Sequence, residues 1–343
     1  MASSLFFDEL AGQPPALRRL IAAYSSPAGR SRLESLPATP PQLLLGMGAS
    51  YHAALVAARH WRQRGLVVQA CEATEALWGE TDLLSQAGHV IYISQSGASA
   101  EVAPVLEHLS PGTRVTALTN DEASPLARQA QTVLPLLAGD ERTVATKTLT
   151  NSIALLWLLG QRWANGISRT DYDRLESVAD RLADRVEQAP SLRAQWIERL
   201  ASANSYALIG AGLQAVSARH AAMIIMEWLK VPAVSASVGA FRHGPIEIMQ
   251  PGLGVVVFAA AGPAYESSCR LAAEIQGYGA NVLLVEAGHT RLPAEPMPGI
   301  GHIDPSLTPI LDVVPVQIFV ETLARERWPA PGFRHIQKVV TVS

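Results

Sequence analysis

Short apolar runs that end in glycine or serine and lead into helix-like segments recur along the first part of the chain. A run at residues 42–45 leads into GMGAS and YHAALVAARHWRQRG, and a run at residues 89–93 leads into SQSGASAE and VAPVLEHL. A third run, at residues 114–118, leads into TNDEAS. Continuous apolar runs that alternate with helices are typical of a parallel sheet covered on both faces. The pattern predicts an α/β fold with a doubly wound sheet.

The second half of the chain repeats this plan. Residues 207–209 lead into GAGLQ and a helical segment, residues 254–258 lead into AAAGPAYES, and an apolar run follows at residues 281–285. Three strand-and-loop units therefore recur in the same order at a nearly constant offset. This repetition predicts two copies of one domain.

The domain organisation follows from these runs. Residues 1–42 are expected to form a helical lead-in, and residues 43–169 the first doubly wound, parallel-sheet domain. Residues 170–200 have a helical pattern rich in arginine, aspartate and glutamate, and are expected to connect the domains. Residues 201–343 would form the second such domain, with a C-terminal arm that could include a final strand near residues 336–342.

Composition excludes several classes of protein. A chain of 343 residues with 48% hydrophobic residues is long enough for two buried cores. A net charge of −3 without any run of lysine and arginine disfavours nucleic acid as a partner. The isolated Cys71 and Cys269 fit a reducing compartment. With no signal peptide, membrane span or metal-ligand spacing of histidines, we expect a cytoplasmic protein without metal.

The strongest local motif is the serine-rich stretch at residues 94–99, between a predicted strand and a predicted helix. Backbone N–H groups at such a junction favour an anion. The hydroxyls of Ser94, Ser96 and Ser99 add donors, as does the Gln95 amide, and Gly97 allows close approach of a phosphate. An ordinary helix-capping turn is the alternative. The motif is a candidate phosphate-binding loop.

A second loop, GMGAS, follows the first predicted strand and contains Gly48 and Ser50. Taken alone, a GxG motif is usually a tight turn. Beside the serine loop it could form the other wall of one site, because both loops end neighbouring strands. The corresponding loops of the second half lack these serines. We therefore expect only the first domain to hold phosphate.

Three further residues are candidates for chemistry. Glu227 is a lone carboxylate in the apolar run AAMIIMEWLK, where burial would suit a general base. His243 lies before Gly-Pro in a fixed turn and could move a proton near neutral pH. Lys338 is a single cation beside a short apolar stretch. Taken singly, each is also explained as an ordinary surface residue: a helix pair with Lys230, a loop histidine, and a guard on an edge strand.

Taken together, these motifs resemble the sugar isomerase (SIS) family. GMGAS, SQSGAS, a glutamate sixteen positions before HGP, and KVVTV near the end follow the pattern of that family. The chain is most similar to the isomerase half of glucosamine-6-phosphate synthase and to standalone aminosugar-phosphate relatives. The resemblance runs from about residue 43 to the C-terminus.

The resemblance implies a role for each candidate. It matches Ser94, Gln95, Ser96 and Ser99 to the phosphate-binding loop, with Gly48 and Ser50 in the first loop. It makes Glu227 the acid/base that moves a proton between C1 and C2. It makes His243 the ring-opening group, supplied across a homodimer interface, and Lys338 the arm lysine that reaches the open-chain sugar. No cofactor is implied.

The chain departs from this family pattern near the reacting carbons. Ile224 and His220 replace a lysine and a glutamate on the helix of Glu227, Ala240 replaces a glutamate before HGP, and Ala49 replaces a threonine. The stretch at residues 143–147 resembles a family loop but is one residue short. The residue types at the phosphate end are those of the family, whereas those that read the sugar's amino and hydroxyl groups differ.

The resulting expectation is aldose–ketose isomerisation of a hexose phosphate, with loss of ammonia if the sugar carries a 2-amino group. One alternative is a non-catalytic sugar-phosphate sensor with a protein partner. The presence of Glu227, His243 and Lys338 together favours an enzyme over that sensor. Another alternative is a deglycase acting on a phosphorylated sugar–amine adduct, because Ile224 and Ala240 leave room beside C1 and C2.

Overall fold

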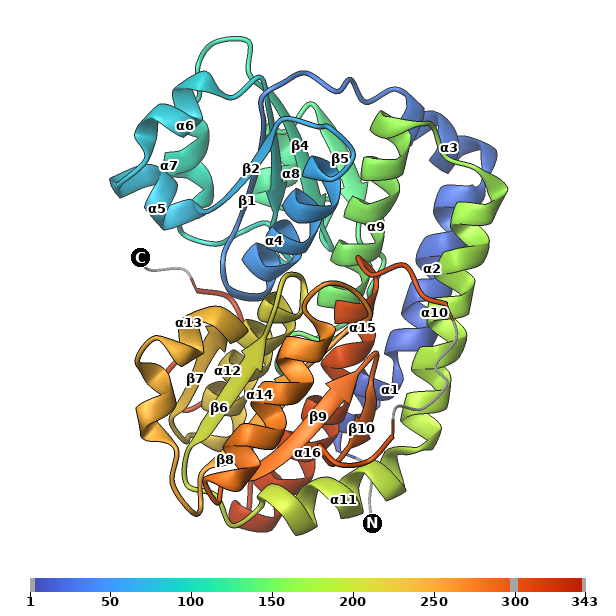
Figure 1. Cartoon of the computed structure of the whole chain (residues 1–343). Coiled ribbons are helices and arrows are strands. Elements are labelled where there is room, and N and C mark those ends of the chain that lie inside the picture. Colours follow the sequence, from blue (N-terminus) through green and yellow to red (C-terminus); the bar gives the residue numbers. More distant parts are fainter. Residues whose placement is uncertain (1–3, 297–301, 341–343) are drawn as a thin grey trace. The chain divides into compact units, whose positions relative to one another are not determined.

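The chain folds into two compact units in the computed structural model, which describes residues 4–296 and 302–340 (Figure 1). The first unit comprises Gly12–Ala179 and Arg334–Ser343. The second unit comprises Met1–Ala11 and Asp180–Phe333. Each unit is built around its own five-stranded sheet.

The sheet of the first unit is parallel throughout, as the apolar runs predict. Its strands are β1 (Gln42–Gly46), β2 (Val68–Glu72), β3 (His89–Ile93), β4 (Arg114–Thr119) and β5 (Thr132–Pro135). They lie in the order β2-β1-β3-β4-β5, and every neighbouring pair is parallel. The carboxyl ends of β1 and β3 are therefore adjacent, at the point where the strand order reverses. Such a point is the usual ligand site of a doubly wound sheet.

Helices cover both faces of this sheet. One face carries α4 (Gly48–Arg62), which packs on β1, β2 and β3 and against α9 (Lys147–Ala164). Two further helices, α2 (Gln13–Ser25) and α3 (Pro27–Glu34), pack on α9. The other face buries Leu43, Leu45, Val90 and Tyr92 in an apolar core with side chains from a series of short helices. Those helices are α5 (Ala73–Trp78), α6 (Thr81–Gln86), α7 (Val102–Glu107) and α8 (Pro125–Gln129).

The second unit has a mixed sheet, so the expectation of a fully parallel sheet is wrong here. Its strands are β6 (Tyr206–Gly210), β7 (Ala233–Ser237), β8 (Gly254–Phe258), β9 (Asn281–Glu286) and β10 (His289–Arg291), in the order β10-β9-β8-β6-β7. The short β10 runs antiparallel to β9. Ala287 and Gly288 both have positive φ, which is the geometry of a two-residue hairpin turn. This turn reverses the chain directly after β9.

The helices of the second unit also lie on both faces of its sheet. Against one face pack α11 (Ala189–Leu200), α12 (Gln214–Leu229) and α15 (Thr308–Asp312), with α16 (Val314–Arg327) against α11 and α12. A short helix, α1 (Leu5–Ala11), packs on α16. The other face buries Ile209, Val255 and Val257 with side chains of α13 (Val238–Arg242) and α14 (Tyr265–Gly277).

The predicted helical connection at residues 170–200 consists of two helices. The first, α10 (Arg169–Glu187), contains the boundary between the units. The second, α11, begins at Ala189 and has Pro190 in its first turn. Proline is tolerated there but removes a hydrogen bond from a helix interior, so one continuous helix is disfavoured. Across the described residues, no helix combines the length and the apolar character that a membrane crossing needs.

Candidate active site

The serine loop begins directly after β3 and is shaped by its own hydroxyls. The Ser94 Oγ accepts a hydrogen bond from the Gly97 N–H at 3.1 Å, and the Ser96 Oγ accepts one from the Ala98 N–H at 3.2 Å. Gly97 has a φ of 59°, in the left-handed region that glycine enters without strain. The loop is thus a compact turn that gathers serine hydroxyls and backbone N–H groups at the end of one strand.

The loop does not run straight into a helix as the sequence pattern predicted. Helix α7 begins at Val102, and its N-cap residue, Glu101, makes no side-chain capping bond. Ala100 and Glu101 form a turn that separates Ser99 from the helix. The donors at the end of β3 are therefore the amides and hydroxyls of the loop rather than those of the first turn of α7.

Strand β4 and the segment that follows it, as far as α8, hold the serine loop in place. The Ser94 N–H donates to the Leu118 carbonyl at 3.0 Å, and the Asn120 N–H donates to the Gln95 carbonyl at 3.0 Å. After the turn, the Leu126 N–H donates to the Gly97 carbonyl at 2.9 Å. These backbone bonds fix the loop before any ligand binds.

The first loop lies at the end of the adjacent strand β1 and opens α4. Gly48 has a φ of 51°, and α4 begins at this residue. A Cβ on Gly46 would lie 2.9 Å from the Cβ of Ser50, so glycine lets the helix approach the strand closely. Because β1 and β3 are parallel neighbours, Gly48 and Ser50 lie at the same sheet edge as the serine loop.

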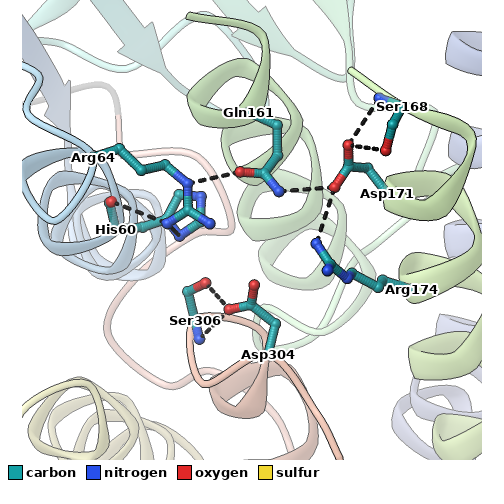
Figure 2. Close-up of polar contacts among 8 residues, drawn as sticks. All are labelled: His60, Arg64, Gln161, Ser168, Asp171, Arg174, Asp304 and Ser306. Atoms are coloured by element: carbon teal, nitrogen blue, oxygen red, sulfur yellow. Dashed lines mark hydrogen bonds and ion pairs between the residues drawn. The ribbon is translucent and has the colours of Figure 1, made fainter. Parts of the chain in front are cut away.

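A polar network ties the far end of α4 to α9 and to the start of α10, all within the first unit. Figure 2 shows its members, which are His60, Arg64, Gln161, Ser168, Asp171 and Arg174. The Arg64 Nε donates to the Gln161 Oε1 at 2.7 Å, and the Gln161 Nε2 donates to the Asp171 Oδ1 at 2.8 Å. The remaining pair in Figure 2 belongs to the second unit, where the Ser306 N–H donates to the Asp304 Oδ1 at 2.9 Å.

Asp171 is the anion of this network. Burial would raise the pKa of Asp171, but hydrogen bonds from Ser168 and Gln161 and the charge of Arg174 hold it below its ordinary value. Asp171 therefore remains ionised near neutral pH. The network fixes the helix whose first turn carries Ser50.

Lys338 reaches the same unit as the serine loop. Its Nζ lies 3.2 Å from the Glu141 Oε2 and donates to the Thr143 carbonyl at 2.6 Å. Two residues later, the Val340 carbonyl accepts a hydrogen bond from the Ala100 N–H at 3.1 Å. Ala100 directly follows Ser99, so the arm and the serine loop are joined by a backbone hydrogen bond. Over residues 334–340 the arm forms no helix or strand.

Glu141 was not found by sequence analysis, although it binds Lys338. Its side chain is fully buried, and its Oε1 accepts the N–H groups of Thr146 and Thr148 at 2.9 and 3.1 Å. Thr146 and Thr148 lie at the start of α9, so the carboxylate also caps that helix. Burial would raise the pKa of Glu141, but Lys338 and the hydrogen bonds from Thr148 and Thr146 hold it below its ordinary value.

The other two chemical candidates belong to the second unit. Glu227 is half-buried in the last turns of α12, and its carbonyl accepts a hydrogen bond from the Lys230 Nζ. His243 is exposed between α13 and the 3₁₀ turn at Pro245–Ile248, and its N–H donates to the Ala240 carbonyl at 3.1 Å. Ile224, where the family resemblance expects a lysine, is buried on α12. Glu227 and His243 therefore belong to one unit, but α12 and α13 pack on opposite faces of its sheet.

Two buried carboxylates, Asp312 and Glu286, lie at the carboxyl ends of the strands in the second sheet. Asp312 accepts a hydrogen bond from the Ser217 Oγ at 2.9 Å and one from the Gln214 Nε2 at 3.3 Å. Burial, with a smaller contribution from Glu286, raises the pKa of Asp312 to about 7. Glu286 is also buried, at the end of β9. Burial also raises the pKa of Glu286. Among the described residues, no cluster of three or more His, Cys, Asp or Glu side chains could hold a metal.

Comparison with protein families identifies the segment that carries both loops. Residues 42–162 match the family model described as SIS domain. This part of the chain is a SIS domain. The match begins at β1 and ends within α9, so it includes the serine loop and Glu141.

Curated relatives extend the likeness beyond this SIS domain. The chain is 28% identical over 297 residues to the isomerizing glutamine–fructose-6-phosphate aminotransferase of Zymomonas mobilis, covering 82% of this chain and 48% of the relative. It is 29% identical over 325 residues to that of Thermococcus kodakarensis, covering 91% and 54%. The chain spans about half the length of the curated relatives it matches. This chain is homologous to the matched part of those relatives.

Solved structures share the fold over nearly the whole chain. Glucosamine-6-phosphate deaminase from Thermotoga maritima has a TM-score of 0.77 at 22% identity, covering 98% of this chain and 99% of that one. Tagatose-6-phosphate ketose/aldose isomerase from Escherichia coli has a TM-score of 0.78 at 22% identity, covering 97% of each chain. At 22% sequence identity, this structural similarity establishes the fold of the chain. The SIS domain and these neighbours confirm the resemblance found in the sequence.

Proposed function

We propose that this chain is a phosphosugar isomerase whose substrate is an aminohexose 6-phosphate of the glucosamine 6-phosphate kind. The observation that carries the proposal is the joint placement of the serine loop and Lys338 in one unit, linked from Ala100 to Val340. A sensor needs phosphate donors but no acid/base group, whereas Glu227 and His243 are also present. The relatives and structural neighbours are named as enzymes of sugar phosphates.

Phosphate binding is assigned to the first unit. Donors would come from Ser94, Gln95, Ser96 and Ser99, with Gly48 and Ser50 at the adjacent strand end. The loop is already fixed by backbone bonds to β4, so little conformational freedom is lost when the phosphate binds. Phosphate binding then orients the reacting carbons at the other end of the sugar.

The chemistry requires proton transfers and water only. His243 assists ring opening by moving a proton to the ring oxygen. Glu227 takes the proton from C2 and returns one to C1, which converts the 2-amino aldose into a ketimine through an enolamine. Water adds to the ketimine, ammonia leaves, and a ketose 6-phosphate remains. With a 2-hydroxyl in place of the amine, the same transfer gives plain aldose–ketose isomerisation.

The second unit is proposed to be a second SIS domain. Its β7-β6-β8-β9-β10 order repeats the β2-β1-β3-β4-β5 order of the first unit, with only the last strand reversed. The proposed boundaries are those expected from the sequence, 43–169 and 201–343, except that the arm from Arg334 onward packs with the first unit. The buried Asp312 and Glu286 are consistent with a copy that has no phosphate of its own to hold.

A homodimer is proposed to complete the site. Exposed apolar side chains of Met226, Val234 and Ile248 lie on α12, on the edge strand β7, and on the 3₁₀ turn next to His243. Covering such side chains and an open strand edge is a usual reason for association. In the proposed dimer, His243 serves the site of the other subunit.

A panel of hexose and aminohexose 6-phosphates, assayed in parallel for ammonia release and ketose formation, tests this function. An aminohexose 6-phosphate should yield equal amounts of ammonia and ketose 6-phosphate. Ketose formation from a neutral hexose phosphate alone would assign plain isomerisation. Binding without turnover of any member would favour the sensor.

A further inference from the structure

The ammonium group of Lys338 can donate three hydrogen bonds, and two acceptors hold it in place. One N–H is directed to the Glu141 Oε2 and one to the Thr143 carbonyl. A lysine ammonium carries three donors, so one remains without an acceptor among residues 4–296 and 302–340. The side chain of Lys338 is 24% exposed and that of Glu141 is not exposed at all. The ammonium is therefore anchored from its buried side and keeps one donor for a ligand.

The carboxylate that anchors Lys338 is itself rigid. Its Oε1 accepts from the N–H groups of Thr146 and Thr148 and from the Thr146 hydroxyl at 3.0 Å. Its Oε2 accepts from the Thr148 hydroxyl as well as from Lys338. A carboxylate with both oxygens bonded to the start of an eighteen-residue helix cannot rotate freely. It therefore fixes the position of the ammonium.

We propose that Glu141 is a positioning residue that sets the Lys338 ammonium against the open-chain sugar. The inference rests on the proposed function, in which Lys338 contacts the substrate. Glu141 touches no substrate atom; it acts by fixing where the remaining N–H of Lys338 lies. Through the bond from Ala100 to Val340, it also keeps the arm in register with the serine loop.

The kinetic test compares the wild type with Glu141→Gln, Lys338→Met and the double variant, using the sugar phosphate that the panel identifies. Glutamine keeps an oxygen for the N–H groups of α9 but presents an amide N–H₂ toward the ammonium. Misplacing a group by about 1 Å can cost roughly 10²-fold in rate, so kcat of Glu141→Gln should fall by about 10- to 100-fold. KM should change little, because the phosphate donors are untouched.

The double variant separates positioning from folding. If Glu141 acts through Lys338, adding Glu141→Gln to Lys338→Met lowers kcat no further. The same fall in both backgrounds would overturn the proposal, because it would make Glu141 a purely structural residue. Asp140→Asn is the matched control. It removes a neighbouring, largely exposed carboxylate, which pairs with Arg142 at 3.4 Å, and should leave kcat unchanged.

Hydrogen exchange tests the anchor without any substrate. The Ala100 amide is bonded to the arm, so its exchange reports whether the arm is docked. Exchange of the Ala100 amide should speed up in Glu141→Gln and Lys338→Met but not in Asp140→Asn. Unchanged protection in both variants would overturn the anchor. If the wild type turns over no sugar phosphate, the proposed function fails while this readout still decides the role of Glu141.

Discussion

The Ser124 Oγ would lie 2.1 Å from a Cβ placed on Gly97, so the turn of the serine loop has room for glycine only. Ser124 is itself fixed, because its hydroxyl caps α8 by accepting from the Ala127 N–H at 3.2 Å. The shape of the loop and the start of α8 therefore depend on each other.

Gly97→Ala should destabilise the protein more than an alanine at a similar but open position. Gly112 also has a positive φ, of 91°, but its Cβ would meet no atom within 4 Å. Gly112→Ala should cost only the backbone strain of about 1 kcal/mol. Gly97→Ala adds overpacking, which typically costs about 1–3 kcal/mol more. Urea unfolding measures both, and equal losses would contradict the close contact with Ser124.

Ser96→Ala should weaken binding of a 6-phosphorylated sugar by about tenfold or more. A hydrogen bond to a charged group contributes roughly 1.5–3 kcal/mol. Calorimetry with glucosamine 6-phosphate measures the loss, and free glucosamine should not bind. Ser85→Ala is the control, since the Ser85 hydroxyl is exposed and donates to the Asp82 carbonyl at 3.0 Å. Equal affinity for glucosamine and its 6-phosphate would rule out the loop as a phosphate site.

Glu227→Gln should abolish proton exchange at C2. The substitution keeps the shape of the side chain and removes its basicity, so turnover should fall by about 10²–10⁴-fold with little change in ligand affinity. Deuterium uptake from heavy water into the sugar phosphate, followed by NMR, measures the step. Glu247→Gln, at an exposed position of the same unit, serves as control. Exchange at the wild-type rate would assign the base to another residue, with Lys338 the next candidate.

Mixing two inactive variants should restore activity if the dimer shares its sites. Glu227→Gln and His243→Ala homodimers should each be nearly inactive. After subunit exchange, some dimers carry both lesions in one site and an intact pair in the other. Activity should then approach a quarter of the wild-type value at equal mixing, since half of the dimers are mixed and half of their sites are intact. A mixture that stays inactive despite verified exchange would mean that His243 serves its own chain.

Asp312 should make stability depend on pH. Its folded pKa of about 7 lies above the ordinary value near 4, so between these values only the folded state holds the proton. Stability from this group is therefore fully present below about pH 4 and is lost as the pH rises through 7. Asp312→Asn cannot titrate, so its stability relative to wild type should increase between pH 4 and 7 and then level off. Urea unfolding across this range checks it, and parallel curves would contradict it.

The sequence pattern located the central strands of both sheets and missed the edges. The runs at residues 42–45 and 89–93 are buried throughout, and the run at 114–118 is buried after the exposed Arg114. The edge strand β2 has the sequence VQACE and β7 has AVSAS, in which polar and small residues interrupt the run. A strand that is covered on one side only needs no continuous apolar sequence. The edges of a sheet are therefore the part that periodicity alone predicts least well.

Glu141 was missed for a different physical reason. The serine loop is a local motif, and the residues that shape it lie within a few positions of one another. Glu141 joins the candidate site through its contact with Lys338, which lies 197 positions later in the chain. A contact at that separation leaves no periodic or spacing signal. The one available hint was the adjacent acids Asp140 and Glu141 just before the stretch at residues 143–147.

The chain leaves the first unit at Ala179, forms most of the second unit, and returns with Arg334–Ser343. During synthesis the ribosome therefore makes the serine loop and Glu141 long before it makes Lys338. For that interval, the buried Glu141 carboxylate has its cap on α9 but no counter-ion. A nascent chain arrested before residue 338 would carry the serine loop and Glu141 without the cation that pairs with this carboxylate. Completion of this site thus follows the synthesis of most of the second unit and is not part of the early folding of the first unit.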